Sequence, residues 1–135
     1  MLTDRDDLCI IKDDSNGFVN TFAMPLRFHD QGGLTMRDWN TDQRGRPFSD
    51  DIKRAVWGKA SIIPGVDSNV VRQDPCGARI YRSEYGKRVE GGWEIDHIRP
   101  VGLGGGDELS NLQAMHWENN RAKGDNYPRY DCKVR

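Results

Sequence analysis

The sequence has few cysteines and no long apolar run. Its three cysteines are odd in number and far apart, so they predict neither a disulfide framework nor a C-x-x-C metal or redox motif; they are Cys9, Cys76 and Cys132. No apolar stretch approaches the ~18 residues that a membrane span needs. The first ten residues lack the basic and apolar regions of a secretory signal. We therefore expect a cytoplasmic protein with reduced thiols and no membrane association.

The chain also has no excess of positive charge. Its 135 residues include 20 Lys and Arg against 21 Asp and Glu, a net charge of −1. This balance excludes binding to nucleic acid through bulk charge alone. The charge is unevenly distributed, because residues 1–51 carry ten acids and six bases and residues 52–135 carry fourteen bases and eleven acids. The C-terminal part could face an anionic partner or simply have an ordinary solvated surface.

Turn-forming residues divide the N-terminal part into short elements. Residues 8–11 and 18–22 are apolar and flank an Asn-Gly turn, which predicts a β-hairpin. Residues 29–47 are polar and rich in turn formers, typical of a loop or linker. Ser49 is a suitable N-cap for a helix that we expect to end near Ala60. The length predicts one main domain, which we place at residues 48–135, after an N-terminal extension at 1–47.

The second part alternates strand, glycine and helix signals. We expect strands at 77–82 and 93–98, a glycine-rich loop, a short extended or helical piece at 111–115, and a helix over 116–123 that ends at Gly124. In the second strand one face is predicted to hold Trp93, Ile95 and His97, and the other Glu94, Asp96 and Ile98.

Asp96 and His97 are adjacent at the end of this strand, so they point to opposite faces and can have separate tasks. Carboxylate and amide oxygens are hard ligands that suit Mg²⁺ or Mn²⁺. A histidine outside the metal shell is a suitable general base for activating water. Together, one metal ion and one base suffice for hydrolysis of a phosphodiester bond.

The motif resembles that of the HNH endonucleases. It reads Asp96-His97-Ile98-Arg99-Pro100, then Gly102 to Asp107, then Leu109 to Gln113, then Asn120 to Asp125. It is most similar to the single-metal subclass with an Asp-His pair and a final Asn, such as the HNH domain of CRISPR effector nucleases. The resemblance implies an α+β protein with a ββα-metal core at 93–125, on which the N-terminal hairpin and helix pack.

The resemblance also implies roles for individual residues. His97 is expected to be the general base, and Asn111 to bridge the glycine loop and orient His97. The expected ligands of one divalent ion, Mg²⁺ or alternatively Mn²⁺, are Asp96 and Asn120. Contacts to the nucleic acid are expected from Arg99, Arg121 and Lys123. The implied substrate is DNA, with RNA left open, and the implied origin is bacterial or phage.

One departure concerns zinc. Many HNH proteins hold a structural zinc with two C-x-x-C pairs, but His116 and Asn119 stand where the second pair would be, so we expect no structural zinc. His116 is an alternative metal ligand, less well matched than Asn120.

Two other functions remain open. One is a non-catalytic DNA-binding or assembly module that keeps the HNH shape, and the other is a toxin nuclease. Residues 1–47 are a candidate surface for a homodimer or for a phage or host partner protein.

Overall fold

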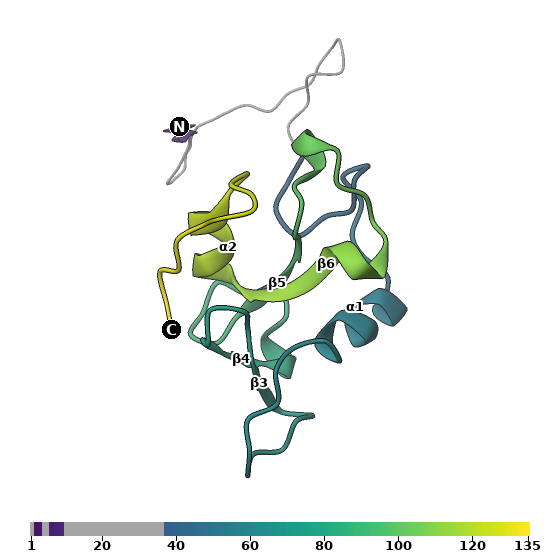
Figure 1. The fold of residues 1–135 in the computed structure, drawn as a ribbon, viewed down its shortest axis with the longest axis vertical. Coiled ribbons are helices and arrows are strands. Elements are labelled where there is room, and N and C mark those ends of the chain that lie inside the picture. Colours follow the sequence, from purple (N-terminus) through teal and green to yellow (C-terminus); the bar gives the residue numbers. More distant parts are fainter. Residues whose placement is uncertain (1, 4–5, 10–36) are drawn as a thin grey trace. The chain divides into compact units, whose positions relative to one another are not determined.

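The computed structural model describes residues 37–135 and, of the N-terminal part, residues 2–3 and 6–9 (Figure 1). The chain divides into two compact units, Met1–Arg37 and Asp38–Arg135. In the first, β1 (Leu2–Thr3) pairs antiparallel with β2 (Asp6–Cys9). Most of the predicted hairpin at 8–22 lies outside the described residues. Within the described part, no helix is long and apolar enough to cross a membrane.

The second unit mixes two α-helices with short antiparallel strand pairs, which confirms the α+β class. The pair β3–β4 precedes the pair β5–β6, in which Trp93 lies opposite His116 and His97 opposite Leu112. The elements are α1 (Asp50–Trp57), β3 (Val71–Gln73), β4 (Arg79–Tyr81), β5 (Trp93–His97), β6 (Leu112–His116) and α2 (Trp117–Lys123), with short 3-10 turns at Arg82–Glu84, Val101–Leu103 and Leu109–Asn111. The piece predicted as extended or helical at 111–115 is therefore mainly a strand.

Helix α1 begins as predicted and ends earlier. Ser49 Oγ accepts a hydrogen bond from the main-chain N–H of Ile52 at 3.2 Å, which caps the helix. The helix ends at Trp57, because the following main-chain N–H groups bond three residues back: Lys59 donates to the carbonyl of Val56 at 3.0 Å and Ala60 to that of Trp57 at 3.1 Å. The apolar spacing up to Ala60 had predicted a longer helix.

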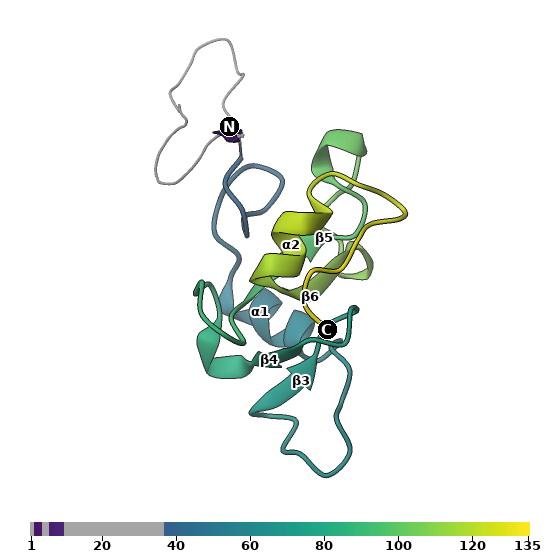
Figure 2. The same ribbon diagram turned by 90° about the vertical axis from the view of Figure 1, so that its left-hand side faces the viewer.

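Strand β5 is buried on both faces, and the two faces differ in chemistry. All five of its residues are buried. Trp93 packs against Trp57 of α1, with ring centroids 5.2 Å apart, whereas Glu94 and Asp96 contact α2. Helices α1 and α2 therefore lie on opposite sides of the β5–β6 hairpin (Figures 1 and 2). The polar face of β5 is thus enclosed beneath α2.

The segment before α1 packs on the hairpin and is not a free linker. The Oδ1 atom of Asn40 accepts hydrogen bonds from the main-chain N–H of Ile95 at 2.8 Å and from the phenol of Tyr85 at 2.9 Å. Asn40 adopts a φ of 61°, which asparagine tolerates better than most residues. The boundary predicted between residues 47 and 48 lies inside the compact unit that begins at Asp38.

The expectation of reduced thiols is wrong for two of the cysteines. Cys76 and Cys132 form a disulfide, with Cα atoms 5.8 Å apart and a sequence separation of 56 residues. The C-terminal segment folds back past α2, where Asn119 Oδ1 accepts hydrogen bonds from the main-chain N–H groups of Lys133 and Val134, each at 2.7 Å. Cysteine spacing alone does not reveal such a long-range pairing, because the two residues meet only once the chain has folded.

Candidate active site

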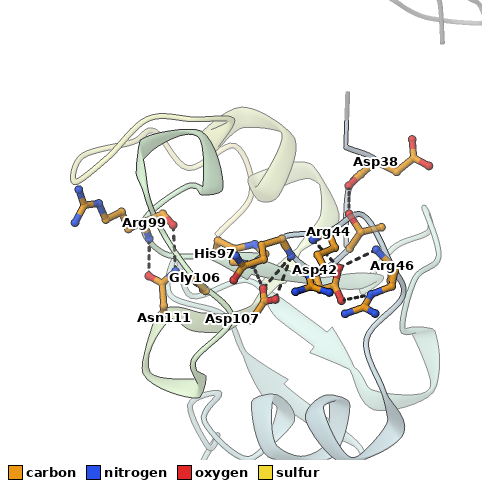
Figure 3. A network of polar contacts seen from close by, with 11 residues as sticks. Asp38, Asp42, Arg44, Arg46, His97, Arg99, Gly106, Asp107 and Asn111 are labelled. Atoms are coloured by element: carbon orange, nitrogen blue, oxygen red, sulfur yellow. Dashed lines mark hydrogen bonds and ion pairs between the residues drawn. The ribbon is translucent and has the colours of Figure 1, made fainter. Parts of the chain in front are cut away.

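His97 is the last residue of β5, and its imidazole is held from one side (Figure 3). The side chain is 5% exposed, and its Nε2 atom is 2.7 Å from Oδ1 of Asp107. The ring of Phe48 lies nearby, with a centroid distance of 6.0 Å. Within the described part of the chain, Nδ1 has no hydrogen-bond partner. His97 therefore presents one anchored nitrogen and one available nitrogen.

Asp107 is itself fixed by the segment before α1. Its two carboxylate oxygens accept hydrogen bonds from the main-chain N–H of Gln43, at 3.0 and 3.2 Å. Figure 3 shows the Asp107 carboxylate between the imidazole and this segment. A main-chain donor that is 64 residues away in sequence thus positions the carboxylate that contacts His97.

Asn111 bridges the end of β5 and the glycine loop. Its Oδ1 accepts a hydrogen bond from the main-chain N–H of Arg99 at 2.8 Å, and its Nδ2 donates to the carbonyls of Arg99 at 3.1 Å and Gly106 at 2.9 Å. Gly105 allows this close approach, because a Cβ atom there would lie 1.7 Å from the Arg99 carbonyl oxygen. The side chain of Asn111 ties together the two segments that flank His97 and Asp107.

Asp96 faces α2, on the other side of β5 from His97. Its Oδ2 accepts a hydrogen bond from Gln113 Nε2 at 2.9 Å and lies 3.3 Å from the ammonium of Lys123. Lys123 is 1% exposed and also donates to the main-chain oxygen of His97 at 3.0 Å. Burial raises the pKa of Asp96, and the Lys123 ammonium and the Gln113 hydrogen bond oppose this shift.

Glu94, two residues before Asp96 on β5, is a second acid that faces α2. Glu94 accepts a hydrogen bond from Asn120 Nδ2 at 2.8 Å and forms an ion pair with Arg121. The guanidinium of Arg121 also lies over the ring of Trp39, 4.3 Å from its centroid. Glu94 and Asp96 of β5 are therefore matched by Arg121 and Lys123 of α2.

The residues expected to contact nucleic acid are in different environments. Arg99 is exposed and its Nε donates to the carbonyl of Leu103 at 2.7 Å. Arg121 and Lys123 are engaged with Glu94 and Asp96 inside the protein. In this arrangement Arg99 is exposed, Arg121 is half-buried and Lys123 is buried.

No role was predicted from the sequence for Asp107, Gln43 or Glu94. The position of Asp107 directly after three glycines was a usable signal, because such a loop can bring an acid close to the strand end. Gln43 contributes a main-chain N–H, which every residue except proline has, so its side chain gave no signal.

The oxygen atoms near α2 suit a hard divalent cation. Asn120 is 2% exposed, and its Oδ1 has no hydrogen-bond partner among the described residues, so it is a buried acceptor without a donor. The carboxylate of Asp96 supplies a charged oxygen on the same interface. Two protein ligands are enough for Mg²⁺, which usually keeps several waters. In the described residues, no three or more His, Cys, Asp and Glu side chains gather as a metal cluster, so the fit rests on the Asp–Asn pair.

Residues 76–126 match the family model of the HNH endonucleases. The matched segment runs from the disulfide cysteine Cys76 through β5, the glycine loop, β6 and α2. This match confirms, for residues 76–126, the resemblance inferred from the motif. Comparisons with curated proteins and with solved structures gave no significant match. HNH nucleases generally use a divalent metal ion and typically bind nucleic acid, so the match suggests nuclease activity in general.

Proposed function

We propose that this protein is a metal-dependent endonuclease that hydrolyses phosphodiester bonds of DNA, with the activity located in the unit Asp38–Arg135. The observation that carries the proposal is the state of His97. Its ring is buried at the end of β5 in the matched domain, with Nε2 anchored and Nδ1 without a partner. A buried imidazole nitrogen that is free to accept a proton is what a general base requires.

The elements β5, β6 and α2 are proposed to be the ββα-metal core, and Asp96 and Asn120 the residues that hold one divalent ion. Mg²⁺ is the preferred ion, with Mn²⁺ as the alternative, because both favour oxygen ligands. When bound, this ion supplies positive charge to stabilise the phosphate and the leaving 3′ oxygen.

The residues of the chain have separate roles in this reaction. His97 Nδ1 takes a proton from a water molecule, whose oxygen forms a bond to phosphorus as the bond to the 3′ oxygen breaks. The 3′ oxygen leaves as an alkoxide that takes a proton from solvent water, so the products are a 5′-phosphate and a 3′-hydroxyl. Asn111 holds the chain around His97, and Arg99 is the proposed contact to a neighbouring phosphate. Arg121 and Lys123 keep the acids beneath α2 neutralised, in place of the phosphate contacts expected from the sequence.

The proposal is tested by the rate at which supercoiled plasmid is nicked with Mg²⁺ or Mn²⁺. His97→Ala is expected to lower the rate by about 10²- to 10⁴-fold, and a chelator to abolish it. Glu90→Gln, which alters an exposed side chain, is the control and should cut like the wild type. Equal cutting by His97→Ala, or no cutting with any divalent ion, would refute the proposal. DNA binding without cutting would instead support a non-catalytic module, and a parallel RNA substrate tests the assignment to DNA.

A further inference from the structure

We propose that Asp107 is a positioning residue for His97: it holds the Nε2–H group and thereby makes Nδ1 the nitrogen that accepts the proton. This inference rests on the proposed function of His97 as a base. It also makes the segment 38–48, which lies before the matched domain, part of the catalytic unit.

The hydrogen bond between His97 and Asp107 can run in one direction only. An ionised carboxylate has only acceptors, so a neutral imidazole in contact with it must donate. The donor is Nε2, which lies 2.7 Å from Asp107 Oδ1. The neutral ring then carries its proton on Nε2 and a lone pair on Nδ1. The tautomer needed for a base at Nδ1 follows directly from the contact with Asp107.

Asp107 is held independently of His97. The main-chain N–H of Gln43 donates to both carboxylate oxygens. Oδ1 therefore accepts from both the imidazole and the main-chain N–H, and Oδ2 also accepts from the main-chain N–H, which restricts rotation of the carboxylate. A carboxylate fixed in this way orients the ring as well as selecting its tautomer.

The turn that contains Gln43 is closed by its own hydrogen bonds. Asp42 Oδ1 accepts from the main-chain N–H groups of Arg44 at 2.9 Å and Arg46 at 2.8 Å, and the main-chain N–H of Asp42 donates to the carbonyl of Arg46 at 2.7 Å. Figure 3 shows this network beside His97 and Asp107. The Gln43 N–H is thus presented by a structured turn, and Phe48 at the end of the segment adds a ring against His97.

The Nδ1 atom of His97 is buried and lacks a hydrogen-bond donor among the described residues. The His97 side chain is 5% exposed, and Nδ1 has no hydrogen-bond partner in the described part of the chain. A buried acceptor without a donor is unfavourable, so this nitrogen is suited to accept a hydrogen bond from a water molecule or substrate. Asp107 keeps the other nitrogen from competing for that role.

The test uses Asp107→Asn, which retains the shape of the side chain. The Asn oxygen can still accept from Gln43 N–H, while its NH₂ group donates to His97 Nε2 and forces the proton onto Nδ1. We expect kcat for plasmid nicking to fall by about 10²- to 10⁴-fold, as for a base held in the wrong tautomer, with KM within about twofold. The ¹⁵N shifts of the His97 ring should show a proton on Nε2 in the wild type and on Nδ1 in Asp107→Asn.

Matched variants separate this role from general effects. Glu108→Gln makes the same change of charge at the next, exposed position and should leave kcat and the His97 tautomer as in the wild type. Asp107→Glu restores a carboxylate and should recover the Nε2–H tautomer and part of the lost kcat, which excludes mere misfolding.

Three outcomes would overturn the inference: wild-type kcat in Asp107→Asn, an unchanged tautomer in that variant, or no recovery in Asp107→Glu. His97→Ala, assayed alongside, separates the two proposals. If it cuts like the wild type, the base assignment itself fails; if it is inactive while Asp107→Asn is fully active, only the role of Asp107 fails.

Discussion

Gly105 offers a sharp test of how the glycine loop supports the site. A Cβ atom on this residue would lie 1.7 Å from the carbonyl oxygen of Arg99 and 2.9 Å from Nδ2 of Asn111. Both distances are far below normal contact, and the nearest atom is main chain, which cannot move aside as a flexible side chain can. Gly105→Ala must therefore displace the strand end or the loop. Gly102, in the same loop, has open space at its Cβ position, so Gly102→Ala is the matched control.

The size of the effect follows from two contributions. Forcing an extra carbon into a packed site costs about 1–3 kcal/mol. The displacement also strains the hydrogen bonds of Asn111 to Arg99 and Gly106, and each such bond contributes about 0.5–1.5 kcal/mol. We expect Gly105→Ala to lower the free energy of unfolding by about 2–5 kcal/mol, and Gly102→Ala to change it by less than about 1 kcal/mol.

Urea denaturation followed by tryptophan fluorescence measures both variants on the same scale. The plasmid assay should show a larger loss for Gly105→Ala, because the loop carries Asp107 and the displaced loop moves it from His97. Equal stability of the two alanine variants, within about 0.5 kcal/mol, would refute the described loop geometry.

Three further predictions concern stability. Asn40→Ala removes the acceptor for Ile95 N–H and Tyr85 OH and places alanine at a φ of 61°. It should lower the free energy of unfolding, measured by urea denaturation, by about 2–3 kcal/mol. Asn40→Asp keeps the acceptor and should lower it by less than half of that. Cys132→Ser opens a loop closed across 56 residues and should lower stability by about 4 kcal/mol; equal melting temperatures for this variant and the oxidised wild type would contradict the disulfide to Cys76. Burial raises the pKa of Tyr85 from 10.0 to about 12, so the unfolded state loses this proton first and stability should fall as the pH rises from 10 towards 12. Alkaline difference absorbance should show a late-ionising phenol signal that is smaller in Tyr85→Phe; an unchanged signal in this variant would contradict the prediction.

The local elements were predictable because their signals are local. Ser49 marked the start of α1, and the alternation from Trp93 to His97 predicted both a strand and the separation of Asp96 from His97 on its two faces. Gly124 marked the end of α2. In each case the deciding interaction lies within a few residues of the signal.

The surroundings of the site were not predictable in the same way. The segment containing Gln43 had the composition of a linker, and what it contributes is a main-chain N–H group. Lys123 was expected at a phosphate, but the buried acid Asp96 provides a partner inside the protein. Cys76 and Cys132 meet only through the path of the C-terminal segment. These features depend on contacts between residues far apart in sequence, which neither composition nor spacing encodes.

The central claim is that His97 acts as the base of a metal-dependent nuclease. The most direct measurement is the initial rate of supercoiled plasmid nicking in Mg²⁺ by the wild type and by His97→Ala, with both proteins shown to be folded. We expect a rate that requires the metal ion and falls by about 10²- to 10⁴-fold in the variant. A variant that nicks the plasmid as fast as the wild type would contradict it.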